Sequence, residues 1–309
     1  MPESLRSTPP TGQQIHLRTP DGRVSAHVAQ VGAALRGLQV DGVDHVPPYP
    51  LDAPAPVASG TVLVPWPNRV RDGAWTQRGQ TRQLAITEPR FTNAAHGLLR
   101  FTAYVVETAT DAAATLAADV YPQTGYPFHL RTRVTYALVE DGVQVAHRIE
   151  NVGSDEAPVA VGAHPFVMIG GVPTSDLTLR SPGATRFVVD ARMLPVAEKA
   201  VDAGTDLRAG VVLGTVDLDT AYGALARDAD GRVRHMLSAE DGRTVTLWQG
   251  PGFDYAQVFT TDRYPGQELA VAIEPMTAPA DALNSGTGLR WLAPGEGWDL
   301  EWGISSSRP

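Results

Sequence analysis

Residues 130–150 read LRTRVTYALVEDGVQVAHRIE, and this stretch predicts a β-hairpin. Side chains suited to one buried face recur at every second position on both sides of Asp141-Gly142: Leu130, Thr132, Val134, Tyr136 and Leu138, then Val143, Val145, His147 and Ile149. Such a period of two is typical of half-buried strands. Because Asp-Gly tolerates the positive φ angles of a two-residue hairpin turn, we expect the turn at this pair.

The same pattern extends outward from the hairpin. Asp-Gly pairs begin at residues 21, 41, 72, 141, 230 and 241, and residues 16–28 and 232–248 alternate around two of them. The chain holds 30 Gly and 25 Pro, a turn-rich composition that argues against a helical bundle. The main helical candidate is the Ala-rich stretch 112–119, although residues 116–120 read equally well as a strand. We therefore predict an all-β fold, with a loose segment at residues 1–12 and a single β-sandwich domain at residues 13–309.

Composition excludes several classes of function. A net charge of -9 without any run of Lys or Arg disfavours nucleic acid as a partner. Zero cysteines exclude disulfides, thiolate metal sites, iron–sulfur clusters and a cysteine nucleophile. The first residues carry no apolar leader, and the apolar stretch 159–172 is too short to span a bilayer, so we expect a cytoplasmic protein without a membrane partner.

Motifs for cofactors and metals are missing as well. The sequence has neither a G-x-G-x-x-G turn leading into a helix nor a phosphate-binding G-x-x-x-x-G-K-[ST] loop. Its eight histidines show no H-x-H or H-E-x-x-H spacing, so no metal site is indicated. The sequence thus predicts chemistry that needs neither a cofactor nor a metal.

Four segments hold polar residues where packing alone does not require them. VPWPNRVRDGAW (64–75) carries Asn68 and Arg69 between prolines and a turn. FTNAAHGL (91–98) carries His96, VAVGAHPF (159–166) carries His164, and LAVAIEPMTAPADALN (269–284) carries Glu274. These segments are the candidates for a functional site.

Glu274 is the most informative of these residues. A carboxylate at the end of an apolar strand is costly to bury unless it is paired, and such surroundings raise its pKa toward neutral pH. The structural alternatives are a Glu274 that caps the loop that follows, a His164 buried only for packing, a His96 that serves only a turn, and an Arg69 that is a surface charge. Taken together, a base, an acid and orienting polar groups on a β scaffold fit proton transfer on a polyhydroxylated small molecule.

In series, the motifs resemble those of aldose 1-epimerases, also called galactose mutarotases. The matching stretches are PWPNRVRDG (65–73), FTNAAHGLLR (91–100), VGAHPF (161–166), LDTAYGAL (218–225) and IEPMTAPADALNSG (273–286). The resemblance implies a galactose-mutarotase-like antiparallel β-supersandwich, monomeric or homodimeric, with a sugar site on its concave face. It also implies interconversion of the α and β anomers of a free aldohexose such as glucose or galactose, without a cofactor.

The resemblance also assigns roles to residues. Glu274 would remove the proton from the C1 hydroxyl, and His164 would protonate the ring oxygen. Arg69, His96 and Asp219 would hold the sugar, although Asp217 lies two residues from Asp219 and would face the same side of a strand. Asn68 would position the loop of Arg69. An apolar platform under the ring would come from one or more of three aromatic residues: Trp248, Trp66 and Phe253.

Three alternatives remain open at this stage. A hexose-6-phosphate 1-epimerase needs cations for the phosphate, and Arg69, Arg71 and Arg100 are available. A non-catalytic sugar-binding protein would use the same face, but it has no need of an acid and base pair. A glycoside hydrolase needs two carboxylates, for which only Glu274 and, less securely, Asp219 have a suitable setting. The acid motif also departs from the family's His-Pro-Tyr-Phe-Asn, because His164 is followed by Pro-Phe-Val-Met.

Overall fold

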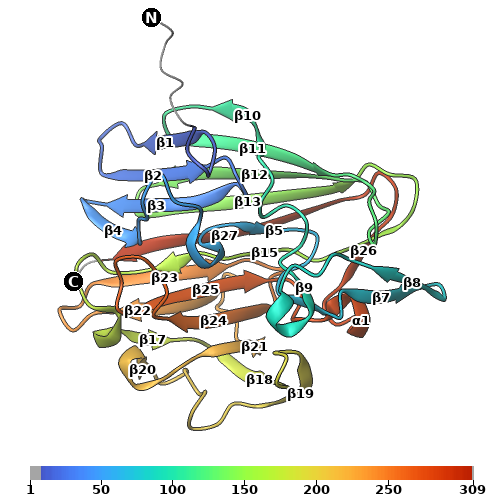
Figure 1. Cartoon of the computed structure of the whole chain (residues 1–309). Coiled ribbons are helices and arrows are strands. Elements are labelled where there is room, and N and C mark those ends of the chain that lie inside the picture. The colour runs from blue at the N-terminus through green and yellow to red at the C-terminus, as the bar shows by residue number, and fades with distance from the viewer. Residues whose placement is uncertain (1–7, 308–309) are drawn as a thin grey trace, which may run out of the picture.

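The structure is a computed structural model that describes residues 8–307, and strands dominate it (Figure 1). Two large antiparallel sheets contribute side chains to one apolar core. The all-β prediction is confirmed. No helix within the described residues is long and apolar enough to cross a membrane.

The larger sheet has nine strands, and the alternating hairpins of the sequence form most of it. In spatial order its strands are β10 (Val105–Ala109), β11 (Ala113–Val120), β12 (Leu130–Val139), β13 (Gly142–Asn151), β27 (Gly297–Ser307), β23 (Thr244–Gln249), β22 (Val233–Ser238), β17 (Thr178–Arg180) and β20 (Val211–Val212).

The second sheet has eight strands and carries the site described below. Its order is β19 (Pro195–Ala200), β18 (Gly183–Val189), β21 (Asp219–Leu225), β24 (Tyr255–Thr261), β25 (Ala270–Met276), β15 (Gly162–Ala163) and β5 (Val62–Leu63), with β16 (Phe166–Val167) also pairing with β25.

Smaller elements complete the described chain. A four-stranded sheet comprises β1 (Gln14–Arg18), β2 (Val24–Ala29), β3 (Ala34–Val40) and β4 (Val43–Val46). Three strand pairs are β6 (Arg69–Arg71) with β9 (Asn93–Ala95), β7 (Ala74–Gln77) with β8 (Gln80–Gln83), and β14 (Ala157–Val159) with β26 (Arg290–Leu292). The short helices are η1 (Pro56–Ala58), η2 (Pro89–Phe91), η3 (Thr174–Asp176), η4 (Leu213–Thr215) and α1 (Ala282–Ser285).

The hairpin of residues 130–150 is confirmed, but its turn lies one residue earlier than predicted. Val139 pairs with Gly142, so Glu140 and Asp141 make the turn and Gly142 is the first residue of β13. Gly142 serves close packing instead of a positive φ, because a Cβ there would lie 1.9 Å from the carbonyl oxygen of Ile304 on β27. The hairpins around Asp21-Gly22 and Asp241-Gly242 form as predicted.

The helical candidate at residues 112–119 is wrong, because this stretch is strand β11. β11 pairs with β12 without a break from Ala113 to Val120, and the bonds of that long ladder outweigh the local helix preference of alanine. At the N-terminus, residues 1–7 of the predicted loose segment lie outside the described residues. Thr11 is buried and accepts a hydrogen bond from the Val31 amide, so ordered structure begins before residue 13.

Candidate active site

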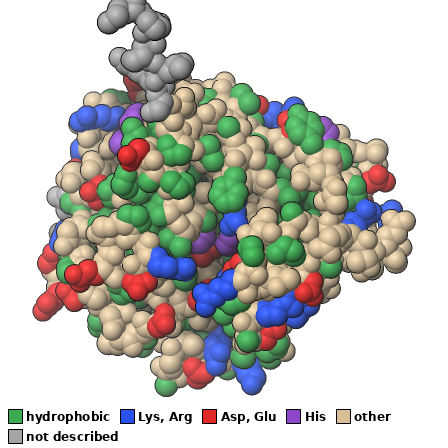
Figure 2. Space-filling view, viewed as in Figure 1, with side chains coloured by type: hydrophobic (Ala, Val, Ile, Leu, Met, Phe, Trp, Pro, Cys, Tyr) green, Lys and Arg blue, Asp and Glu red, His purple; other side chains and the backbone are tan. Residues whose placement is uncertain are grey.

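A cavity of about 430 Å³ opens on one face of the eight-stranded sheet, and its floor comes from three neighbouring strands. Gln257 on β24 lies directly opposite Glu274 on β25, and Asp219 on β21 lies opposite Phe259 on β24. Residues two apart on a strand share a face, so this register brings all four side chains to the cavity. Figure 2 shows the hollow, with histidine and acidic side chains inside it and basic side chains around it.

His164 lies across from Glu274 because of the strand register on either side of it. Gly162 pairs with Met276 and Phe166 pairs with Ala272, so the position between them faces Glu274. The His164 amide donates to the Thr61 carbonyl, which holds the backbone where the β15 ladder ends. As a result, His164 Nε2 lies 3.3 Å from Glu274 Oε1, and both side chains are buried.

Burial disfavours the charged form of both members of this pair. Desolvation raises the pKa of Glu274 well above its usual value, and the nearby Asp219 adds to the effect. Desolvation also lowers the pKa of His164 to about 4. Glu274 Oε2 and His164 Nδ1 are buried without a hydrogen-bond partner among residues 8–307, which is costly in a finished core. The pair therefore has proton-transfer groups and unsatisfied polar atoms in one place.

A polar network lies beside the pair, in the wall of the cavity. Arg69 donates to both carboxylate oxygens of Glu88, at 2.9 and 3.1 Å, and to Asn68 Oδ1 at 3.2 Å. Asn68 Nδ2 donates to Gln257 Oε1, and Gln257 Nε2 donates to Asp219 Oδ1. Arg69 is therefore held in place by a bidentate pair and an amide, as expected for a side chain that orients a ligand.

His96 enters the cavity from a strained turn that follows β9. Its φ is 62°, and its amide donates to the Asn68 carbonyl at 2.8 Å. A Cβ at Gly97 would lie 2.1 Å from the Val64 carbonyl oxygen, so only glycine fits after His96. The ring lies 5.6 Å from that of His164, and desolvation lowers the pKa of His96 well below its usual value. His96 is thus a neutral hydrogen-bonding group beside the pair.

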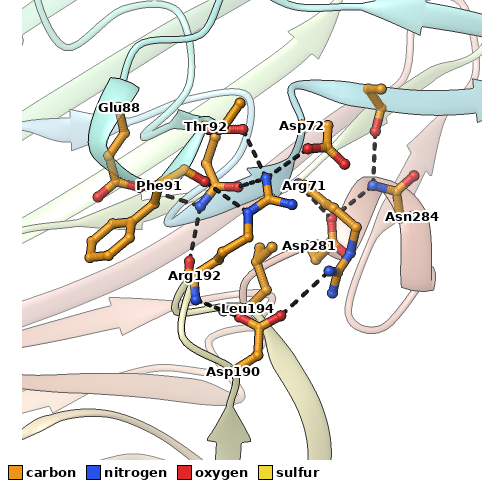
Figure 3. A network of polar contacts seen from close by, with 12 residues as sticks. Arg71, Asp72, Glu88, Phe91, Thr92, Asp190, Arg192, Leu194, Asp281 and Asn284 are labelled. Carbon is orange, nitrogen blue, oxygen red and sulfur yellow. Dashed lines mark hydrogen bonds and ion pairs between the residues drawn. The ribbon is translucent and has the colours of Figure 1, made fainter.

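A second polar network supports the segment that carries Glu88 and Phe91 (Figure 3). Arg192, from the loop between β18 and β19, donates to the carbonyls of Phe91 and Thr92 and contacts Asp72 at 2.7 Å. In the same network, Arg71 donates to Asp281 and lies 3.6 Å from Asp190. These contacts fix the cavity wall, and they also keep Arg71 out of the cavity lining.

Six of the seven predicted site residues line the cavity: Glu274, His164, Arg69, His96, Asp219 and Asn68. Asp217 does not, because β21 begins at Asp219 and Asp217 is exposed in the segment between η4 and β21. Trp248 is a correction: it lies on β23 of the nine-stranded sheet, where the Arg232 guanidinium lies 3.9 Å from its ring centroid. Trp66 and Phe253 are buried in the apolar core and do not line the cavity either.

Sequence reasoning missed several lining residues, chiefly Glu88, Gln257, Phe91, Phe259, Arg90 and Arg263. Gln257 and Phe259 alternate on a strand, but nothing in the local sequence shows that this strand lies beside that of Glu274. Within residues 8–307, no cluster of three or more His, Asp or Glu side chains is arranged to hold a metal ion. The arrangement is suited to general acid–base chemistry on a hydroxyl-rich ligand.

Comparison with known proteins gives a consistent result. The sequence profile of the aldose 1-epimerase family matches residues 13–305. An Escherichia coli K12 protein named uncharacterized protein YihR is 29% identical over 308 residues, covering 96% of this chain and 94% of that protein. The crystal structure of a GalM/aldose epimerase homologue from C. elegans has a TM-score of 0.83 at 17% identity and covers 96% of this chain and 99% of its own. That of galactose 1-epimerase from Lactobacillus acidophilus has a TM-score of 0.77 at 17% identity, with 94% and 92% covered.

Proposed function

The chain belongs to the aldose 1-epimerase family, and on that premise we propose that it is an isomerase that interconverts the α and β anomers of an aldohexose. The simplest substrates are free glucose and galactose. One observation carries the proposal: a buried carboxyl and a buried imidazole lie 3.3 Å apart in a polar cavity, and each has an atom without a hydrogen-bond partner among residues 8–307.

The pair supplies one base and one acid per turnover. Glu274 takes the proton from the C1 hydroxyl while His164 gives a proton to the ring oxygen, and the bond between C1 and the ring oxygen breaks. The open-chain aldehyde rotates about its C1–C2 bond and closes from the other face, with both protons returned. Each residue ends as it began, so the reaction consumes no cofactor. A well-placed acid or base typically contributes about 10²–10⁴-fold to the rate.

A single proton shared by the pair satisfies these requirements. Before a sugar binds, desolvation favours the uncharged form of the pair, with the proton on Glu274, because it raises the pKa of Glu274 and lowers that of His164. A bound sugar donates its C1 hydroxyl to Glu274 and offers its ring oxygen to His164. Both contacts favour moving the proton across the 3.3 Å contact to His164, which prepares the base and the acid together.

The surrounding groups bind and orient the sugar in this proposal. Arg69 offers donors in a fixed plane, and Asp219 accepts from neighbouring hydroxyls. His96 adds a neutral ring nitrogen, and Asn68 positions Arg69 through their 3.2 Å hydrogen bond. A purely sugar-binding protein would need these groups but would have no use for the Glu274–His164 pair.

Polarimetry tests the proposal. Freshly dissolved α-D-glucose and α-D-galactose are followed with the protein, without it, and with Glu274→Gln. We expect the wild-type protein to accelerate anomer interconversion over the rate in buffer. Glu274→Gln should lower this enzymatic rate by about 10²–10⁴-fold, because the amide cannot accept the proton. Glu240→Gln, an exposed residue outside the cavity, is the matched control. Sugar binding without acceleration would instead support the binding protein, and near-normal turnover in Glu274→Gln would disprove the assignment of the base.

A further inference from the structure

Three arginines in the cavity lining have no acidic partner. Among the described residues, no carboxylate lies within ion-pair distance of Arg90, Arg100 or Arg263. Arg90 and Arg100 lie over the rings of their neighbours Phe91 and Phe101, at 5.0 and 4.6 Å, and Arg263 reaches only the Thr261 hydroxyl, at 3.4 Å. They contrast with the arginines just outside the cavity, since Arg71 and Arg192 lie 3.4 and 2.7 Å from Asp281 and Asp72.

The cavity is therefore positive in a protein whose net charge is -9. Four arginines and three acidic residues line it, and the charge of Glu88 is matched by Arg69, which bonds both of its oxygens. Glu274 shares one proton with His164 and adds no net charge to the pair. Asp219 is then the main remaining negative charge of the lining, and its carboxylate lies 4.0 Å from the Arg69 guanidinium and beyond ion-pair distance of the other three arginines.

Arg100 is the most informative of the three because it is partly buried. Arg90 and Arg263 are exposed at the rim, where water solvates a guanidinium at little cost. Arg100 lies deeper, and burial lowers the pKa of its guanidinium even though Glu88 acts in the opposite direction. A partly desolvated cation without a partner is unfavourable in the empty protein, and an anionic ligand would relieve that cost.

Arg100 also lines the same cavity as His164 and His96. Its charge disfavours protonation of both His164 and His96, so it lies within electrostatic range of the residue that faces the ring oxygen. The ring oxygen of an aldohexose is bonded to C5, and C5 carries the exocyclic carbon C6. With the ring oxygen at His164, a substituent on C6 lies on the His164 side of the sugar, in the cavity that Arg100 also lines.

From these observations we propose that the natural substrate is an aldose with an anionic group on its exocyclic carbon, held by Arg100 and attracted at the rim by Arg90 and Arg263. This inference rests on the proposed epimerase function and deepens it. A guanidinium is suited to an oxyanion because its donors lie in one plane and form paired, charge-assisted hydrogen bonds. A phosphate or a sulfate ester shares the required chemistry, and the experiment distinguishes them.

Magnetisation exchange between the α and β anomeric protons tests the inference, because it measures interconversion at equilibrium without pure anomers. Glucose, glucose 6-phosphate, glucose 6-sulfate and glucuronate are compared at low ionic strength, each corrected for its rate in buffer. We expect kcat/KM for at least one anionic sugar to exceed that for glucose by about 10-fold or more, and the advantage to shrink with added salt. The preferred member identifies the group as a phosphate, a sulfate or a carboxylate.

Arg100→Gln should lower the ratio of anionic to neutral kcat/KM by about 10-fold or more, since a charge-assisted hydrogen bond is lost. Arg100→Lys keeps the charge and should retain part of the preference, which separates charge from a folding defect. The matched control is Arg18→Gln, at an exposed arginine on β1 outside the cavity, and it should leave the ratio unchanged. Equal use of neutral and anionic sugars, or an unchanged ratio in Arg100→Gln, would overturn the inference and leave the epimerase proposal standing. Failure with every sugar would instead overturn the epimerase proposal.

Discussion

His235 on β22 and His164, in the short connection between β15 and β16, are buried histidines, and burial lowers the pKa of each to about 4. On β22 of the nine-stranded sheet, His235 Nδ1 lies 2.8 Å from the Ser181 hydroxyl and Nε2 lies 3.2 Å from Gln249 Oε1. Beside the eight-stranded sheet, the His164 ring has Glu274 as its one polar side-chain partner among residues 8–307, and its Nδ1 is left without a hydrogen bond there. The pKa shift therefore does not distinguish the two histidines, whereas their bonding does.

The two regions differ in whether their buried polar side chains have all their hydrogen-bond partners. Gln249 donates to the carbonyls of Phe253 and Tyr255, so its oxygen faces His235 and the local hydrogen bonds are complete. Around the proposed catalytic pair, Glu274, His96 and His164 itself all line one cavity, and each has a buried polar atom without a hydrogen-bond partner among residues 8–307. A completed network stabilises the fold, while an incomplete one lining a cavity is suited to bind and transform a ligand.

The largest test of this comparison is to make the same substitution in both regions. His164→Asn should lower kcat by about 10²–10⁴-fold, because the amide cannot supply the proton to the ring oxygen. His235→Asn should leave kcat per folded molecule unchanged. The measurement is the rate of anomer interconversion, normalised to the folded fraction by circular dichroism.

The free energy of unfolding should respond in the opposite order, with the larger loss in His235→Asn. His235→Asn leaves Ser181 or Gln249 without its partner and should lower the free energy of unfolding by about 1–3 kcal/mol in urea denaturation. His164→Asn should change it by less, because fewer bonds are lost. A catalytic defect in His235→Asn at full folding would contradict the division between the two regions.

A change in pH sharpens the comparison further. Burial lowers the pKa of His147 to about 3 and those of His164 and His235 to about 4, from 6.5. At a pH between the folded-state pKa and the unfolded-state pKa of 6.5, each of these histidines binds a proton in the unfolded chain but not in the folded chain. The stabilising contribution of each histidine is therefore present above pH 6.5 and is lost as the pH falls toward 4, by about 2 kcal/mol per histidine between pH 7 and pH 5.

Glu274 acts in the opposite direction, since its raised pKa lets the folded protein retain a proton above pH 4.5. Three histidines outweigh this one group, so the free energy of unfolding should be lower at pH 5 than at pH 7. Urea denaturation at the two pH values measures the difference, and His235→Asn should reduce it. Greater stability of the wild-type protein at pH 5 would show that these histidines are not held neutral.

A smaller effect distinguishes the two neighbouring aspartates. Asp219→Asn removes a carboxylate that lines the cavity and should raise KM by about 10-fold, with kcat much less affected. Asp217→Asn is the matched control, because Asp217 is exposed and outside the cavity, and its KM should stay at the wild-type value. Equal effects of the two substitutions would remove Asp219 from the binding site.

The smallest expected effect lies in the supporting network. Arg192→Met keeps the apolar stem but removes the donors to the Phe91 and Thr92 carbonyls, so we expect a KM increase of about 2–5-fold and faster amide exchange in residues 87–96. Arg208→Met, which loses an exposed pair with Asp206, should change neither. An unchanged exchange rate in Arg192→Met would show that the cavity wall does not depend on this arginine.

Local sequence determined much of this protein. Alternation on both sides of residues 140–142 predicted β12 and β13, because a strand with one buried face must repeat every second residue. His164 before proline and Glu274 at the end of an apolar run stood out because polar groups there are costly without a function. Residues 112–119 were ambiguous, and only pairing with β12 made them a strand.

Tertiary structure decided how these pieces meet. Gln257 joins the site because β24 lies beside β25 in one register, and Trp248 is outside it because β23 belongs to the other sheet. Similarly, Arg71 and Arg100 look alike in the sequence, yet one is bound by acidic side chains and the other lines the cavity unpaired. A sequence pattern indicates which face of a strand is buried and which polar residues are costly to bury. Sheet order and long-range ion pairs depend instead on contacts between residues far apart in the chain.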